Sequence, residues 1–295
     1  MKIAGVDIGG TKIKYCLYDT DKPFGTDIVK TAPTHADRGG RYVINNILDI
    51  LAGLGSFDRI GICSTGQIDV DTGKVIYACD NVPDYTGILL SDAFKERFGV
   101  PVAVENDVNA AMLAEALFGA GKPDEFIIGV AYGTGIGGAI VCNGKLFHGS
   151  SCSAGEFGHT MVHAGGIECT CGNRGCYEAY ASTGALCRMA LKRFGKPLSG
   201  RDITARRGDP EYDALIAEWI EEVVYGLVSI VHIFNPDNLI LGGGIMEDKI
   251  ILDSVKERLL SSVIVSYRNV AVNAAVFGNA AGLRGAIHLA RTMEP

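Results

Sequence analysis

The same pattern, an apolar run, a glycine-rich turn and a second apolar run, occurs twice in this chain. It spans residues 2–18 around Asp-Ile-Gly-Gly-Thr-Lys and residues 126–142 around Gly-Thr-Gly-Ile-Gly-Gly. Glycines let backbone amides approach an anion closely, so each turn is a candidate phosphate site. One such turn alone is equally consistent with an ordinary tight hairpin. Two of them predict a duplicated α/β unit whose domains face each other across a nucleotide-binding cleft.

The first turn carries additional polar groups. Asp7 can face a hydrated Mg2+ beside the phosphates, while Thr11 and Lys12 add hydrogen-bond donors. A strand and not a helix follows Gly9 and Gly10, so this turn differs from the Walker and dinucleotide-binding patterns.

A cysteine cluster, Cys169-x-Cys171-x4-Cys176, lies among glycines and polar residues. His159 lies ten positions upstream of Cys169, and three thiolates with one imidazole form the closed tetrahedral set of a structural Zn2+. Such a metal would hold the local shape and would not activate water. His163 is a competing histidine that spacing does not exclude. Buried free cysteines or a disulfide are the alternatives, although nine cysteines without an export signal favour reduced thiols and metal ligands.

Two carboxylates, Glu156 and Glu178, flank this cluster. A zinc-braced loop would hold both as rigid acceptors for a polyhydroxylated ligand. The alternative interpretation is a pair of solvated surface glutamates.

Composition limits the range of functions. The 295 residues, 47% hydrophobic and 21% charged, suffice for two compact globular domains. The formal net charge of -7 argues against a nucleic-acid surface, which needs clustered Lys and Arg. The N-terminus does not have the pattern of a signal peptide, and no apolar run approaches the ~20 residues of a membrane span. We therefore expect a cytoplasmic protein without nucleic-acid or membrane partners.

Hydrophobic periodicity predicts alternating strands and helices, and therefore an α/β fold. Strands are predicted at residues 2–6, 13–18, 59–63, 100–104, 126–132, 139–142 and 238–241. Helices are predicted at residues 37–54, 110–118, 177–194, 210–234, 248–261 and 279–291, with 195–209 as a polar connection. The loops that contain Gly66 and Asn81 are candidate ligand loops, although plain connections are the likelier interpretation from spacing alone.

Two further positions follow strands. Asp107 lies at a strand-to-helix junction, where a helix N-terminus keeps a carboxylate ionised and able to accept a hydroxyl proton. An ordinary N-cap is the equal alternative. The triple glycine 242–244 lets a flat group such as adenine lie against bare backbone, unless it is only a flexible turn.

Five motifs together resemble those of the ROK family (repressors, open reading frames, sugar kinases). They are Asp7-x-Gly-Gly-Thr-Lys, Glu105-Asn-Asp-x-Asn, Gly133-Thr-Gly-Ile-Gly-Gly, Gly155-Glu-x-Gly-His and Cys169-x-Cys-Gly-x-x-Gly-Cys-x-Glu, and the resemblance runs from Lys2 to about Ala290. It implies the actin-like, ribonuclease H-like fold with two α/β domains around an ATP and sugar cleft. The expected domains are residues 1–118, on which a C-terminal helix at about 279–295 packs back, and a larger domain of residues 119–278 with the zinc segment. The resemblance also implies phosphoryl transfer from MgATP to a hexose hydroxyl, most often that on carbon 6.

The resemblance implies roles for individual residues. Asp107 matches the catalytic base, and His159 would bind zinc through one ring nitrogen and a sugar hydroxyl through the other. The implied sugar contacts are Gly66, Asn81, Asn106, Asp107, Glu156, His159 and Glu178. The implied MgATP contacts are Asp7, Gly9, Gly10, Thr11 and Lys12 in the first turn, Gly133, Thr134 and Gly135 in the second, and Gly243 and Gly244 on the adenosine side. The implied zinc ligands are His159, Cys169, Cys171 and Cys176.

Two loops depart from the family pattern. Ser64-Thr-Gly66 replaces the usual Pro-Gly turn, and Asn81-Val-Pro-Asp-Tyr85 replaces Asn-x-x-Gly-Trp. Glucose is the substrate that we expect first, with N-acetylmannosamine or a β-glucoside as alternatives. Sugar-responsive repressors of the family carry an N-terminal winged helix, whereas the first hairpin here begins at Lys2, so we expect a kinase. A catalytically silent sugar sensor is the other non-enzyme alternative, and the resemblance implies a homodimer.

Overall fold

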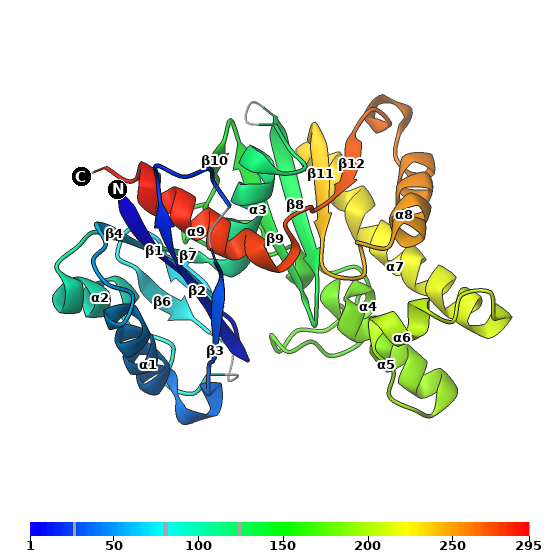
Figure 1. Ribbon diagram of the computed structural model, residues 1–295. Helices are drawn as coiled ribbons and strands as arrows, with labels where there is room; N and C mark the ends of the chain where they lie inside the picture. The colour runs from blue at the N-terminus through cyan, green and yellow to red at the C-terminus, as the bar shows by residue number, and fades with distance from the viewer. Residues whose placement is uncertain (26–27, 79–81, 123–124, 295) are drawn as a thin grey trace. The chain divides into compact units, whose positions relative to one another are not determined.

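The computed structural model describes residues 1–25, 28–78, 82–122 and 125–294 (Figure 1). Contacts between residues divide the chain into two compact units. The first unit comprises Met1–Ala114, His148–Ala154 and Asn279–Pro295, and the second comprises Glu115–Phe147 and Gly155–Gly278.

The first unit is built on a five-stranded sheet with the order β3-β2-β1-β4-β7. Its strands are β1 (Lys2–Ile8), β2 (Lys12–Asp19), β3 (Lys30–Pro33), β4 (Arg59–Ser64) and β7 (Val102–Asn106), and the separate hairpin β5 (Gln67–Asp69) and β6 (Lys74–Tyr77) follows β4. β1 and β2 form an antiparallel hairpin, while β4 and β7 run parallel to β1. The register aligns Ile8 with Ser64 and Ser64 with Asn106. The glycine turn after β1 and the loops after β4 and β7 therefore share one edge of the sheet.

Helices cover both faces of this sheet, which explains why its central strands β1 and β4 are mostly apolar and almost entirely buried. They are α1 (Gly40–Ala52), α2 (Leu90–Phe98), the first turns of α3 (Asp107–Phe118) and α9 (Ala281–Thr292). Val43 and Phe94 of α1 and α2 are buried on one face, and Ile287 of α9 on the other. Burial of each such side chain stabilises the unit by about 1.5–3 kcal/mol. Gly61 of β4 has no room for a Cβ, because the carbonyl of Ala286 in α9 occupies that space.

The second unit contains a sheet with the order β10-β9-β8-β11-β12. The strands of this sheet are β8 (Phe126–Tyr132), β9 (Ile136–Cys142), β10 (Lys145–Leu146), β11 (Asn238–Gly242) and β12 (Ala271–Ala274). The helices of the unit are α4 (Glu178–Ala181), α5 (Thr183–Phe194), α6 (Gly200–Thr204), α7 (Pro210–Phe234) and α8 (Lys249–Ser262). β8 and β9 form an antiparallel hairpin, and β11 and β12 continue in parallel with β8. Both sheets thus join a hairpin to two parallel strands, which confirms the predicted repetition of one α/β unit.

Several predicted boundaries were wrong. The single helix predicted over residues 177–194 is interrupted at Ser182, whose side chain accepts a hydrogen bond from the Ala185 N–H and so caps α5. The segment predicted as a polar connection contains α6, which begins at a capping box formed by Ser199 and Asp202. The helix predicted from residue 110 begins at Asp107. The prediction also missed α2, β3, β5, β6, β10 and β12.

α7 shows how local signals define a helix. Asp209 accepts a hydrogen bond from the Glu211 N–H, Pro210 occupies the first turn, and Asn235 ends the helix in the left-handed conformation. In the part of the chain that the structure describes, no helix combines the length and apolarity needed to cross a membrane.

Candidate active site and metal centre

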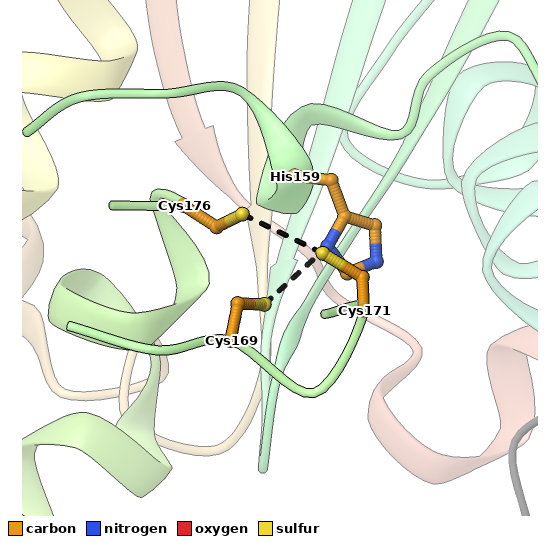
Figure 2. A group of neighbouring side chains, drawn as sticks. All are labelled: His159, Cys169, Cys171 and Cys176. Carbon is orange, nitrogen blue, oxygen red and sulfur yellow. Dashed lines mark hydrogen bonds between the residues drawn. The ribbon is translucent and has the colours of Figure 1, made fainter. Parts of the chain in front are cut away.

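Four side chains of the second unit, His159, Cys169, Cys171 and Cys176, point toward one another (Figure 2). Their candidate ligand atoms all lie within 4.8 Å of one another. Cys169 Sγ lies 3.7 Å from His159 Nδ1, and Cys171 Sγ lies 3.7 Å from Cys176 Sγ. A tetrahedron with Zn–S bonds of about 2.3 Å has edges of about 3.8 Å. The predicted donor set therefore fits Zn2+ in both chemistry and size.

The structure distinguishes the two candidate histidines. His163 Nε2 lies 2.7 Å from Glu222 Oε2, and its ring packs against Tyr180 with 4.3 Å between ring centroids. These contacts leave His159 as the histidine of the cluster.

The thiols differ in their surroundings. The Asn173 backbone N–H lowers the pKa of Cys171 to about 7, while burial raises the pKa of Cys169 to about 12. Cys169 Sγ also donates to Glu178 Oε1 at 3.2 Å. No disulfide links the cysteines that the structure describes.

Both flanking glutamates lie close to the His159 ring of the cluster. Glu156 Oε2 lies 3.9 Å from His159 Nε2, and Glu178 Oε1 lies 4.0 Å from His159 Nδ1. One ring nitrogen therefore faces the thiols, and the other faces Glu156 and is available for a second partner. The Glu178 side chain is 15% exposed against 43% for Glu156, so Glu178 is the more firmly held acceptor.

Glu178 also contacts the second glycine turn. The Ile136 N–H donates to Glu178 Oε2 at 3.2 Å, and a Cβ at Gly135 would collide with the same oxygen. The turn is closed by a hydrogen bond from the Gly133 N–H to the Gly135 carbonyl, and the Gly184 N–H at the start of α5 donates to the Gly133 carbonyl. Glu178 therefore connects the segment that carries the cysteine cluster to the predicted phosphate turn within the second unit.

A pocket of about 450 Å³ adjoins this turn. Gly133, Thr134 and Gly244, which were predicted to bind ATP, line it. Sequence reasoning missed the other polar lining residues, which come from α5, α6 and their junction: Thr183, Cys187, Ser199, Arg201 and Thr204. The Ser-x-x-Asp pattern at residues 199–202 was the signal that could have revealed α6. Pockets of this size commonly hold small ligands.

The two predicted glycines after β11 have different environments. Gly243 has a φ of 97°, and a Cβ there would meet the Tyr132 carbonyl oxygen, so it allows the close approach of two backbones. Gly244 has open space around it and lines the pocket. Gly244 is thus the glycine that the structure places beside a ligand cavity.

In the first unit, Asn106 and not Asp107 caps α3. Asn106 Oδ1 accepts the N–H groups of Val108 and Asn109 at 2.9 and 3.0 Å, which is the pattern of an N-cap side chain. Asn106 Nδ2 donates to the Gly66 carbonyl at 2.8 Å. The alternative interpretation of Asp107 as an ordinary N-cap is therefore wrong. Asp107 is the first helical residue, and its Oδ1 accepts the Val108 N–H at 2.9 Å.

Burial raises the pKa of Asp107 to about 6, and the negative charge of Asp7 contributes next, while hydrogen bonds from Val108 and Asn106 oppose the shift. The residue as a whole is only partly buried, but its carboxyl group is largely shielded from solvent. The donors at the start of α3 favour the ionised form, as the sequence predicted, but burial outweighs them. A pKa near 6 leaves Asp107 mostly ionised at pH 7 and makes it a stronger base than an ordinary aspartate.

The first glycine turn is held in a fixed shape. The Gly9 N–H donates to the Lys12 carbonyl at 3.2 Å, and Thr34 ties both ends of the turn through its Oγ1 to the Gly9 carbonyl and its N–H to the Thr11 carbonyl. Gly10 has open space beside it, and Lys12 is exposed. This is the arrangement that a backbone anion site requires.

A hydrogen bond joins the two loops that depart from the family pattern. Ser64 Oγ and Tyr85 Oη lie 2.7 Å apart, and both residues are buried. Gly66 has a φ of 94°, which suits glycine. Asn81, predicted to contact the sugar, lies outside the described residues.

A hairpin with a glycine turn, joined to parallel strands and repeated in two units, is the topology of the actin-like ATPases. The chain belongs to the ROK family, whose pattern matches residues 3–293.

Three relatives illustrate this similarity. A glucokinase from Streptomyces coelicolor is 33% identical over 99% of this chain and 98% of its own. A beta-glucoside kinase from Klebsiella pneumoniae is 32% identical over 98% of this chain and 95% of its own. The crystal structure of a ROK family glucokinase from Streptomyces griseus with glucose and AMPPNP is 32% identical, covers 99% of this chain and 100% of that one, and has a TM-score of 0.84.

Proposed function

We propose that this chain transfers the terminal phosphoryl group of ATP to carbon 6 of glucose or a closely related aldohexose. The chain is an ATP-dependent sugar kinase, as its glucokinase relatives and ROK structural neighbours indicate. The observation that carries the proposal is the position of Asp107. A shielded carboxylate with a raised pKa lies beside Asp7, which directly precedes the first glycine turn. One unit thus holds a proton acceptor next to a phosphate-binding turn.

Asp107 acts as the general base. Its Oδ1 accepts the Val108 N–H, so we assign proton acceptance from the sugar hydroxyl to Oδ2. Phosphoryl transfer needs alignment and charge neutralisation more than covalent chemistry, and the amide-rich glycine turns orient the phosphates. When bound, Mg2+ would neutralise charge on the phosphates, with Asp7 as the carboxylate that faces it.

In the second unit, we assign sugar binding to Glu156, Glu178 and His159 Nε2. Carboxylates and imidazole N–H groups suit sugar hydroxyls, and a bound Zn2+ would fix the His159 ring through Nδ1. The pocket lined by Gly133, Thr134 and Gly244 suits the nucleotide.

Glucose is the first choice, because relatives over the whole length of the chain are named glucokinases. The second candidate is a β-glucoside, because a beta-glucoside kinase is 32% identical over 98% of this chain. N-acetylmannosamine is a further alternative, since the loops at Ser64 and Tyr85 depart from the family pattern. 6-Deoxyglucose has no hydroxyl on carbon 6, so it should not react, and it should bind more weakly than glucose because it leaves a buried partner unpaired.

A coupled assay with MgATP and glucose, N-acetylglucosamine, N-acetylmannosamine, mannose and cellobiose tests the substrate. We expect the highest kcat/KM for glucose, and a clearly higher value for another sugar would overturn that choice. Asp107→Asn should lower kcat by at least ~10²-fold while nucleotide binding is kept. A variant that retains more than about a tenth of wild-type turnover would remove Asp107 from this role. Sugar binding without turnover in the wild-type protein would favour the sensor, and sedimentation velocity will test the implied homodimer.

A further inference from the structure

Lys14 forms a cross-strand ion pair inside the first hairpin. The register of β1 and β2 places it directly opposite Asp7, and Lys14 Nζ lies 2.7 Å from Asp7 Oδ2. The Lys14 side chain is 27% exposed and that of Asp7 is 10% exposed. Because both partners are largely shielded, this pair is less screened by water and salt than an ordinary surface salt bridge. The contact therefore fixes the Asp7 carboxylate and places a positive charge at the base of the first glycine turn.

Asp7 in turn faces two other acidic groups. Cys63 lies opposite it on β4, and the Cys63 thiol hydrogen-bonds to Asp7. Burial raises the pKa of Cys63 well above its usual value, and the charges of Asp7 and Asp107 raise it further. A Cβ at Gly282 of α9 would lie 3.1 Å from Cys63 Sγ, 3.5 Å from Asp7 Oδ2 and 3.6 Å from the Asp107 carbonyl oxygen. The backbone of α9 at Gly282 therefore covers this cluster, and glycine adds no charged side chain at that position.

Asp7 on β1 is the nearest negative charge to Asp107. Cys63 on β4 and Tyr85 stay neutral, because burial raises the pKa of Cys63 well above its usual value and that of Tyr85 to about 12. Asn106 at the end of β7 is uncharged and donates a hydrogen bond that favours the ionised carboxylate. The positive charge of Lys14 on β2 reaches Cys63 and lowers its pKa. Among the described residues, Lys14 is the cation that forms an ion pair within this cluster.

We propose that Lys14 is a positioning residue for phosphoryl transfer, whose ammonium holds the Asp7 carboxylate and offsets its negative charge at Asp107. This inference rests on the proposed function and adds a residue that none of the sequence motifs singled out. Without Lys14, the unbalanced charge of Asp7 disfavours ionisation of Asp107, so the base takes up a proton at a higher pH. Asp7 also loses the contact that fixes its orientation beside the glycine turn.

The experiment compares kcat/KM profiles against pH for the wild type, Lys14→Met and Lys14→Arg. Lys14→Met should move the acid limb upward by about half to one pH unit, so that activity falls ~2- to 5-fold at pH 6 and hardly at all at pH 8.5. Lys14→Arg keeps the charge and should keep the limb within about 0.3 unit of the wild type. Lys30→Met, an exposed lysine on β3 of the same sheet, is the matched control and should leave the profile unchanged. An equal loss at every pH would show a merely structural role and overturn the proposal.

A second measurement does not depend on activity. Carbon-13 NMR titration of the Asp carboxyl groups in the ligand-free protein, assigned with Asp107→Asn, should show the Asp107 midpoint rising by about half to one unit in Lys14→Met. An unchanged midpoint overturns the inference about Lys14, whichever sugar is phosphorylated. Conversely, if the midpoint moves but no sugar is phosphorylated by the wild type, the charge coupling stands and the proposed function fails.

Discussion

The segment His148–Ala154 reaches the candidate base through a single buried carboxylate. Glu105 is 2% exposed, and three donors satisfy it: the Asn106 N–H at 2.8 Å, Asn109 Nδ2 at 3.0 Å and His148 Nε2 at 2.7 Å. Glu105 directly precedes the pair Asn106 and Asp107. We predict that His148→Ala both destabilises the protein and loosens the start of α3, because Glu105 Oε2 loses its donor.

The size of the effect follows from these contacts. A hydrogen bond to a charged group contributes about 1.5–3 kcal/mol, and we place the bond between two charged partners at the top of this range and the bond between neutral His148 and charged Glu105 at its lower end. The hydrogen bond to Glu105 raises the pKa of His148, so its extra contribution is fully present below about pH 6.5 and is lost as the pH rises through the raised pKa. We therefore expect His148→Ala to cost about 3 kcal/mol at pH 5.5 and about 1.5 kcal/mol at pH 9.

Differential scanning calorimetry of the wild type and His148→Ala at both pH values measures this loss of stability as a change in Tm. At about 2–4 °C per kcal/mol for a chain of this size, Tm should fall by about 6–12 °C at pH 5.5 and 3–6 °C at pH 9. His148→Gln keeps a donor without the charge and serves as the control: its loss should be smaller than that of His148→Ala, and should fall towards zero at pH 9, where the wild-type His148 is also neutral. Equal losses for His148→Ala at both pH values, or a greater loss at pH 9, would refute the charged hydrogen bond as the cause.

Two further predictions concern the second unit. Purified protein should hold close to one zinc per chain, and Cys171→Ser should lose both the metal and thermal stability, whereas Cys142→Ser, an exposed cysteine outside the cluster, should lose neither. Metal-free protein with normal kinase activity would refute the zinc site and favour the alternative of free cysteines in the core. Gly135→Ala places a methyl group against Glu178 Oε2, so the KM for the sugar should rise at least ~10-fold with a smaller change in kcat. An unchanged KM would separate Glu178 from sugar binding.

Local patterns in the sequence predicted much of the fold. Glycine turns between apolar runs predicted both hairpins, because a glycine pair between two strand-like segments has few other structures to adopt. The cysteine spacing predicted the metal cluster, because ligands a few residues apart meet through short-range backbone geometry alone. Strong caps at both ends made the bounds of α7 predictable to the residue.

Tertiary contacts decided the rest. The separation of α4 from α5 at Ser182 depends on α7, since Trp219 Nε1 donates to the Ala181 and Ser182 carbonyls and fixes a break that helical periodicity does not show. The choice of His159 over His163 depends on Glu222, which is distant in sequence. The break has only the local signal of the Ser182 cap, and the choice of histidine has none.

The ionisation of Asp107 is the clearest such case. Its neighbours in sequence are hydrogen-bond donors that favour the charged form, and these were the groups that sequence reasoning could weigh. The larger effects are burial and the charge of Asp7, which lies on β1, far from Asp107 in the sequence, and is paired with Lys14 on β2. Electrostatic effects depend on distance and solvent exposure, which only the folded structure sets. The sequence by itself predicted which residues carry the chemistry, and the tertiary structure decided the burial, the neighbouring charges and the contacts of each one.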